Sequence, residues 1–195
     1  MLSTGGTAMT RPLRADAQRN RARILAAAEE VFTRVGPQAS TEEVAARAGV
    51  AVGTVFRHFP TKDALLSAIM KNLRQRLTEE ADALLADGGA DDALFTFFSG
   101  VVRRAADTRT VVELLRRTGV EVGPDAPVRE LGPALHRLLA RAQDAGRVRG
   151  DVTTEDVVAL LTAACHGALR GGWDERLQER VLSIVFAGLA PGGGA

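Results

Sequence analysis

The chain has 195 residues, of which 46% are hydrophobic and 25% are charged, a composition typical of a globular protein of one or two domains. A single cysteine excludes an intramolecular disulfide, and the lack of a signal-peptide core or of an apolar run of about 20 residues predicts a cytoplasmic protein that does not enter a membrane. The net charge of +1 is unevenly spread, because residues 1–76 carry 12 Arg and Lys against 6 Asp and Glu, and the remainder carries 13 against 18. The basic N-terminal third favours a polyanionic partner for that end.

The N-terminal segment predicts an arm followed by one long helix. Residues 1–14 contain Gly, Ser, Thr and Pro and are expected to form a flexible arm. Apolar residues then recur at helical spacing over about 16–35. Gly36 and Pro37 are predicted to end this helix.

Two short helices are predicted within residues 41–59, TEEVAARAGVAVGTVFRHF. The first begins after Ser40, which forms a capping-box pattern with Glu43, and ends at Gly49, which supplies the positive φ of a tight turn. The second covers residues 52–59. Two short helices joined at a steep angle by a tight turn are typical of helix-turn-helix DNA-binding proteins, although such a pair is also compatible with plain core scaffolding.

The second short helix has one apolar face and one face suited to DNA. If Val55 points inward, a rotation of 100° per residue places Gly53, Thr54 and Arg57 on the opposite side, with Phe56 at the margin. Glycine allows close approach of the backbone to DNA, a threonine hydroxyl donates to a phosphate or base, and a guanidinium binds guanine or phosphate through two hydrogen bonds. This face is the candidate DNA-reading surface.

The rest of the chain is predicted to be helical as well. A fourth helix begins after Thr61 and fades near Asp87, and Pro133 is expected to kink or restart one of the later helices. No alternating β pattern of useful length is present. The later amphipathic segments cover about 91–107, 109–118, 128–146, 153–170 and 174–189. The expected fold class is therefore all-α, with about nine helices.

The stretch GVAVGTVFRHFPTKDALL, residues 49–66, resembles the signature of the TetR (tetracycline repressor) family, and the resemblance extends over about residues 16–75. It implies an N-terminal three-helix DNA-binding domain at residues 15–61 and a helical effector-binding and dimerisation domain at 62–195. A protein of this family is expected to be a ligand-responsive repressor that binds palindromic double-stranded operator DNA as a homodimer. Activation instead of repression is the alternative.

The resemblance also implies roles for individual residues. Thr41 would contact phosphate at the start of the second helix, Thr54, Arg57 and His58 would lie on or beside the major groove, and Lys62 would pair with a phosphate. The complete predicted DNA-binding set is Thr41, Val52, Gly53, Thr54, Phe56, Arg57, His58 and Lys62.

Two positions depart from the family pattern. Ala51 stands where serine is frequent, so the recognition helix lacks a side-chain N-cap that is typically worth about 1 kcal/mol. Phe56 stands where tyrosine is frequent, so a hydroxyl that usually meets phosphate is absent. Arg57 is the expected source of the compensating phosphate contact.

The C-terminal half shows no arrangement that predicts an enzyme, a metal site or a cofactor. His58, His136 and His166 are far apart in the sequence. Cys165 and His166 are adjacent, so they diverge by about 100° on a helix and suit one metal ion poorly. An enzyme would need clustered polar residues here, and a purely protein-binding helical module would not need the Gly53, Thr54 and Lys62 pattern.

The helical body is expected to hold a hydrophobic or aromatic small-molecule effector. The predicted pocket residues are Phe95, Phe98, Val101, His136 and Trp173, with Arg103, Arg104 or His136 as polar anchors. Aromatic residues at helical spacing are also typical of an ordinary core, so that alternative stands beside the first.

The last two predicted helices are expected to form the dimer interface. Each carries a broad apolar stripe, which includes Leu161 on one and Ile184 on the other, and small residues allow close helix packing. The same stripes could equally pack inside one subunit.

Overall fold

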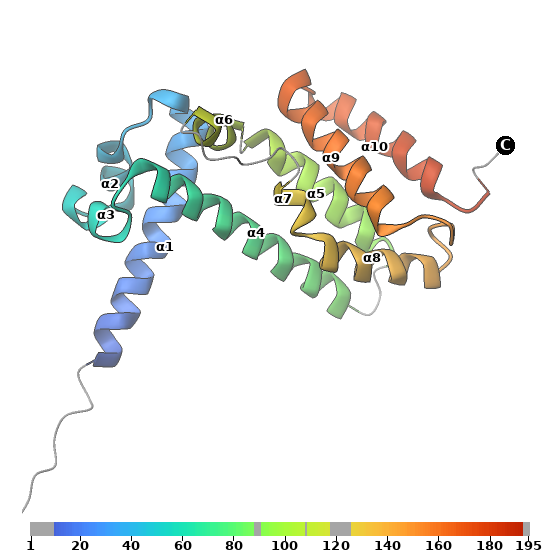
Figure 1. The fold of residues 1–195 in the computed structure, drawn as a ribbon, viewed down its shortest axis with the longest axis horizontal. Helices are drawn as coiled ribbons and strands as arrows, with labels where there is room; N and C mark the ends of the chain where they lie inside the picture. Colours follow the sequence, from blue (N-terminus) through green and yellow to red (C-terminus); the bar gives the residue numbers. More distant parts are fainter. Residues whose placement is uncertain (1–9, 88–90, 108, 118–125, 193–195) are drawn as a thin grey trace, which may run out of the picture. The chain divides into compact units, whose positions relative to one another are not determined.

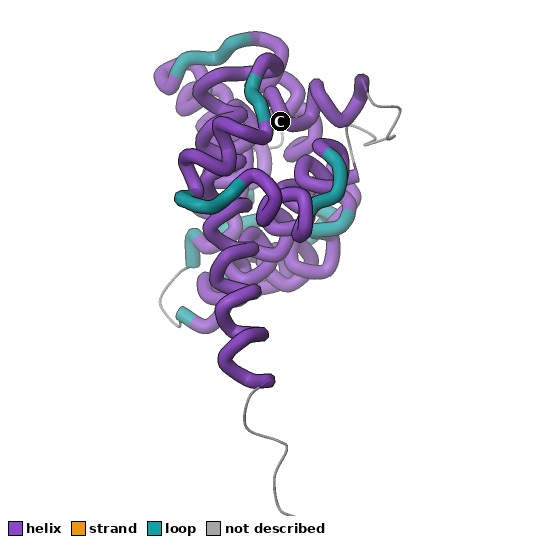
Figure 2. The backbone as a smooth tube through the Cα atoms, turned by 90° about the vertical axis from the view of Figure 1, so that its left-hand side faces the viewer, coloured by secondary structure: helices purple, strands orange, loops and turns teal. Residues whose placement is uncertain are grey.

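The computed structural model describes all residues except 1–9, 88–90, 108, 118–125 and 193–195 (Figure 1). Over the described residues the chain forms helices, turns and loops, without a strand (Figure 2). The helices, in chain order, are α1 (Thr10–Val35), the 3-10 helix η1 (Gly36–Gln38), α2 (Thr41–Ala48), α3 (Val52–His58), α4 (Lys62–Ala86), α5 (Ala93–Asp107), α6 (Arg109–Arg117), α7 (Ala126–Arg129), α8 (Gly132–Asp144), α9 (Thr154–Gly171) and α10 (Glu175–Leu189). The predicted all-α class, with a helix-turn-helix followed by a helical body, is confirmed.

Two prolines lie in the first turns of helices. Residues 10–14, expected in the flexible arm, are the start of α1, and the remainder of that arm lies outside the described residues. Pro12 falls in the first turn, where backbone N–H groups have no intrahelical acceptor, so it costs no hydrogen bond. Pro133 likewise lies in the first turn of α8, which confirms the predicted restart of the helix there, and α7 precedes it. The described part has ten α-helices, close to the expected number of about nine.

The chain divides into two compact units, residues 1–69 and 70–195, and α4 contributes to both. The division lies eight residues beyond the domain boundary expected after residue 61. The reason is apolar burial, because Leu65, Leu66 and Ile69 in the first turns of α4 are each only 1% exposed. In the first unit α1 packs against α2, and α2 packs against α3.

The second unit is built around α9. This helix packs against α5, α7, α8 and α10, and its Val157 and Leu161 side chains are completely buried. A capping box begins the helix: the Oγ1 of Thr153 accepts a hydrogen bond from the N–H of Asp156, and the Asp156 carboxylate accepts one from the N–H of Thr153. The backbone hydrogen bond from Thr153 lowers the pKa of Asp156.

None of the described helices is both long enough and apolar enough to cross a membrane. Within the described ranges, no three His, Cys, Asp or Glu side chains gather in a manner suited to a metal ion.

The thiol of Cys165 on α9 should be unreactive in the folded protein. The side chain is buried, and desolvation raises its pKa to about 12, so the nucleophilic thiolate is scarce near neutral pH. We expect iodoacetamide at about pH 8 to leave the native protein unlabelled and to alkylate it fully in guanidinium chloride. Mass spectrometry measures both, and rapid labelling of the native protein would contradict the buried position of this thiol.

Candidate functional site

The turn between α2 and α3 has the geometry that its sequence predicts. Ser40 caps α2: its Oγ accepts a hydrogen bond from the N–H of Glu43 at 3.1 Å, and the Glu43 carboxylate accepts one from the N–H of Ser40 at 2.8 Å. Gly49 ends α2 in the left-handed region, at φ 65° and ψ 41°. Ala51 gives α3 no side-chain cap, in agreement with the departure noted in the sequence. The predicted inward residue Val55 is completely buried.

Side chains of α1 and α4 hold the two ends of α2. At the C-terminal end, the Arg23 guanidinium donates to the carbonyl oxygen of Ala48 at 2.6 Å. At the N-terminal end, the Lys62 ammonium donates to the carbonyl oxygen of Ala39 at 2.8 Å and lies 5.4 Å from the centre of the Phe32 ring. Both cations are therefore used to position α2 within the first unit.

Other N-terminal arginines are also engaged within the protein. Arg47 forms an ion pair with Glu30 at 2.6 Å, and their hydrogen bond lowers the pKa of Glu30 and raises that of Arg47. The guanidinium of Arg21 lies 5.2 Å from the centre of the Phe59 ring, directly after α3. Some basic side chains of the N-terminal third therefore stabilise contacts within this unit and are not only surface charges.

The exposed face of α3 is formed as the helical pattern predicts. Gly53 and Arg57 lie one turn apart on the side opposite Val55, and both are exposed. A Cβ built at Gly53 would meet no atom within 4 Å, so the space above this glycine is open. Arg57 has no hydrogen-bond or ion-pair partner among the described residues.

The other predicted DNA-binding residues surround this face at different depths. Phe56 is 44% exposed. Thr41 is the first residue of α2 and Val52 the first of α3; both are half-buried, as are Thr54, His58 and Lys62. Sequence reasoning missed the contact of Lys62 with Ala39, because the partners are 23 residues apart and no local pattern joins them.

Of the five predicted effector residues, Phe95 alone lines the groove described on the second unit. Phe95 lines a groove of about 760 Å³ on the second unit, whereas Phe98 and Val101 are buried in the core. His136 is exposed, with its Nδ1 3.1 Å from the Oγ1 of Thr154. Trp173 follows α9, and its ring covers Gly167 and Gly171 so closely that a Cβ at Gly167 would collide with it. This groove therefore includes one of the five predicted residues, and a pocket formed by all five stays a prediction.

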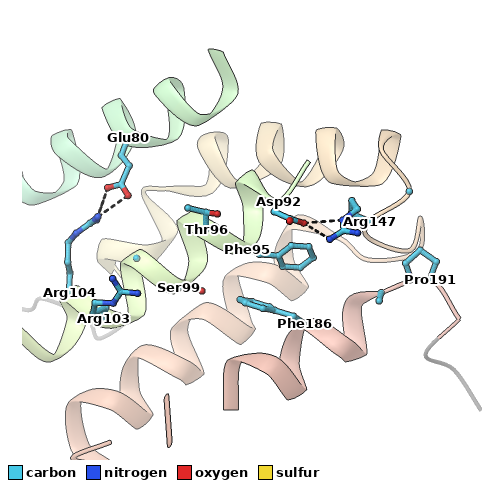
Figure 3. Close-up of a pocket in the computed structure, with 13 residues that line it drawn as sticks. Glu80, Asp92, Phe95, Thr96, Ser99, Arg103, Arg104, Arg147, Phe186 and Pro191 are labelled. Carbon is cyan, nitrogen blue, oxygen red and sulfur yellow. Dashed lines mark hydrogen bonds and ion pairs between the residues drawn. The ribbon is translucent and has the colours of Figure 1, made fainter. Parts of the chain in front are cut away.

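The groove is more polar than the expected apolar pocket (Figure 3). The rings of Phe95 and Phe186, 4.7 Å apart between centroids, lie in its middle. The two arginines proposed as anchors, Arg103 and Arg104, line one end, while His136 does not line it. Sequence reasoning missed Phe186, because nothing local indicates that the last helix meets α5.

The last two helices expose less apolar surface than their stripes suggest. Leu161 is completely buried within the unit, so it is a core residue and not an exposed interface residue. Ile184 on α10 is 72% exposed, and Leu177 and Val181 on the same face are half-buried. The unpaired apolar surface of this pair of helices is therefore centred on α10.

Comparison with known proteins accounts for both units. Residues 24–69 match the N-terminal model of the bacterial regulatory proteins of the tetR family, and residues 89–191 match the SbtR-like transcriptional regulator C-terminal domain. The HTH-type transcriptional repressor Rv3405c of Mycobacterium tuberculosis is 35% identical over 153 residues, which cover 78% of this chain and 70% of the relative.

Solved structures give the same assignment. A TetR regulatory protein from Mycobacterium vanbaalenii has a TM-score of 0.75 and 40% identity, covering 92% of this chain and 99% of its own. The TetR-family protein CprB from Streptomyces coelicolor, solved with its operator sequence, has a TM-score of 0.64 and 25% identity over 90% of each chain. The helix-turn-helix, the helical body and these matches together show that the chain belongs to the TetR family of transcriptional regulators.

Proposed function

We propose that this regulator is a ligand-responsive repressor that binds a palindromic operator as a homodimer in the cytoplasm. The observation that carries the DNA-binding part is the outward face of α3, where exposed Gly53 and unpaired Arg57 stand one turn apart above open space. The similar Mycobacterium tuberculosis protein is named a repressor, which favours repression over activation. The similar CprB structure contains operator DNA, which favours direct duplex binding.

Dimerisation through α9 and α10 supports this function geometrically. The exposed Ile184 and the half-buried Leu177 and Val181 form one apolar stripe on α10. A second copy would cover this stripe across a two-fold axis and present two recognition helices to one duplex. Successive major grooves on one side of DNA are about 34–36 Å apart, so the operator is expected to have two half-sites at that spacing.

Effector control requires a link between the two compact units, and α4 belongs to both. A ligand that prefers one position of α4 would change the spacing of the recognition helices and release the operator. A coupling free energy of about 1–3 kcal/mol suffices for a 5- to 150-fold loss of operator affinity.

Two substitutions on α3 test the DNA-reading face. Gly53→Ala should keep or raise the free energy of unfolding, because alanine favours a helix over glycine by up to about 1 kcal/mol and its Cβ meets nothing in the free protein. The same methyl group should weaken operator binding by blocking the approach of DNA. Arg57→Ala should cost about 1–3 kcal/mol if it reads guanine.

The measurement starts from a duplex selected out of a random library by the wild-type protein. Fluorescence anisotropy over a salt series then gives affinity and salt slope, and thermal unfolding reports stability. Gly150→Ala and Arg137→Gln, both in the second unit, are the matched controls. Wild-type affinity in both Gly53→Ala and Arg57→Ala would show that this face does not dock on DNA.

Lys62→Met should distinguish the role of Lys62 in positioning α2 from its proposed role in binding a DNA phosphate. Methionine keeps the apolar stem beside Phe32 but removes the hydrogen bond to the Ala39 carbonyl, so the unfolding temperature should fall. If Lys62 also pairs with a phosphate, affinity should fall for all duplexes alike and the salt slope should decrease by about one. A reduced unfolding temperature with an unchanged salt slope would refute the phosphate contact.

A further inference from the structure

We propose that the groove between α5 and α10 binds a small monoanion with an aromatic body, whose carboxylate pairs with the guanidinium of Arg103. That this ligand is the effector rests on the proposed function. The binding itself rests on the chemistry of the groove, which lies wholly within the second unit.

The middle of the groove is suited to a flat apolar group. Phe95 of α5 and Phe186 of α10 are both half-buried and line it, with their rings tilted by 53° (Figure 3). Phe98 fixes Phe186 from the core side, at 5.5 Å between ring centroids and edge to face. The pair is therefore held in place while leaving aromatic surface accessible to a ligand.

Ion pairs neutralise most of the charge that lines the groove. Arg104 donates two hydrogen bonds to the Glu80 carboxylate, at 2.7 and 2.8 Å. At the other end Arg147 donates to Asp92 at 2.6 and 3.0 Å. Arg103 is exposed and has no partner among the described residues, so the lining carries one uncompensated positive charge. A single negative charge on the ligand complements it.

The face of α5 aligns polar groups between the phenylalanines and Arg103. Thr96, Ser99 and Arg103 recur at helical spacing and all line the groove. Arg103 comes eight positions after Phe95, which corresponds to a rise of about 12 Å along the helix and sets the length of a ligand that touches both. Gly100 lies beside this path, where a Cβ would be in van der Waals contact with the Glu80 and Arg104 side chains at 3.4 Å. Its missing side chain leaves the groove open beside that ion pair.

The groove and the exposed apolar stripe occupy different faces of α10. Ile184 and Phe186 are two residues apart, which is about 200° around a helix. Ile184 is 72% exposed, whereas Phe186 packs on α5. A partner copy that covers Ile184 thus leaves the Phe186 side of the helix available to a ligand.

The test uses biphenyl-4-carboxylate as the probe and its neutral carboxamide as the matched compound, titrated into the full chain by isothermal calorimetry. We expect the carboxylate to bind wild type at least fivefold more tightly than the carboxamide. Arg103→Gln should remove that preference while leaving carboxamide affinity unchanged. Glu80→Gln should strengthen carboxylate binding, because it removes one of the two negative charges that line the groove.

Arg137→Gln is the charge-matched control, since Arg137 is exposed, pairs with Asp82 and does not line the groove. Equal affinities for the two compounds, or an unchanged preference in Arg103→Gln, would overturn the proposed site. Operator affinity with and without saturating probe is measured separately. A preference for the carboxylate that depends on Arg103 establishes the binding site, even when the probe does not release DNA. An operator affinity that the probe leaves unchanged would then contradict only the role of this groove as the effector site.

Discussion

Ile184→Glu is expected to convert the protein into a folded monomer that no longer binds its operator. Ile184 is 72% exposed in the isolated subunit, so a glutamate there meets water and leaves the subunit fold intact. In a dimer the same position would bury a carboxylate on an apolar stripe, and burial of an unpaired charge is strongly unfavourable. Loss of the second recognition helix removes bivalent binding, which typically contributes a factor of about 10²–10⁴ in affinity.

Light scattering measures the mass, circular dichroism the helix content, and anisotropy the binding to the selected duplex. Ser183→Glu is the matched control, because Ser183 is exposed on α10 but points away from the Leu177, Val181 and Ile184 stripe. A dimer of Ile184→Glu with wild-type operator affinity would place the interface elsewhere. Leu161→Glu cannot serve this test, because Leu161 is completely buried and its substitution would unfold the subunit.

The features that sequence predicted correctly are those with short-range causes. The Ser40 and Glu43 capping box closes within one helical turn, and the left-handed Gly49 depends on backbone sterics at one residue. The inward position of Val55 follows from a helix only two turns long. Each such choice is nearly independent of the rest of the fold, so a local pattern suffices.

The apolar stripe on α9 shows what a local sequence pattern cannot predict. Leu161 and Ile184 both satisfy helical apolar periodicity, yet one is completely buried and the other is the most exposed large hydrophobic residue among those described. Periodicity identifies a face that avoids water but not the element that covers it. That information depends on tertiary packing, in which α9 lies among four neighbouring helices.

The lining of the groove could not be predicted from the sequence for a related reason. Trp173 and Phe95 are both aromatic, but Trp173 covers two glycines of α9 while Phe95 meets Phe186. Phe95 and Phe186 are 91 positions apart, so no local spacing links them. The charged ends of the groove likewise come from side chains on α4, α5 and the loop after α8. Composition alone predicted an apolar pocket and could not indicate how these charges are paired.

Gly49→Ala is expected to destabilise the DNA-binding unit and to abolish operator binding at protein concentrations that saturate the wild type. The left-handed conformation at φ 65° costs a residue with a Cβ about 1–2 kcal/mol. In addition, the new Cβ would stand 3.0 Å from the Nη2 of Arg23, the atom that donates to the Ala48 carbonyl. The Arg23 side chain is long enough to move aside, but moving breaks the bond that holds the end of α2. The turn between α2 and α3 then loses both its backbone conformation and the hydrogen bond from Arg23 that stabilises it.

Gly36→Ala provides the matched control, because Gly36 also has a positive φ, of 80°, but a Cβ there meets nothing within 4 Å. Both variants should lower the free energy of unfolding, and Gly49→Ala should lower it further and lose more operator affinity. Arg23→Gln should weaken operator binding on its own, and in the Arg23→Gln background the difference between the two glycine variants should shrink, because the displaced contact is already gone. Chemical denaturation and duplex anisotropy measure these effects. Equal losses in Gly49→Ala and Gly36→Ala would show that Arg23 does not brace the turn, and the recognition helix would then owe its position to apolar packing around Val55 alone.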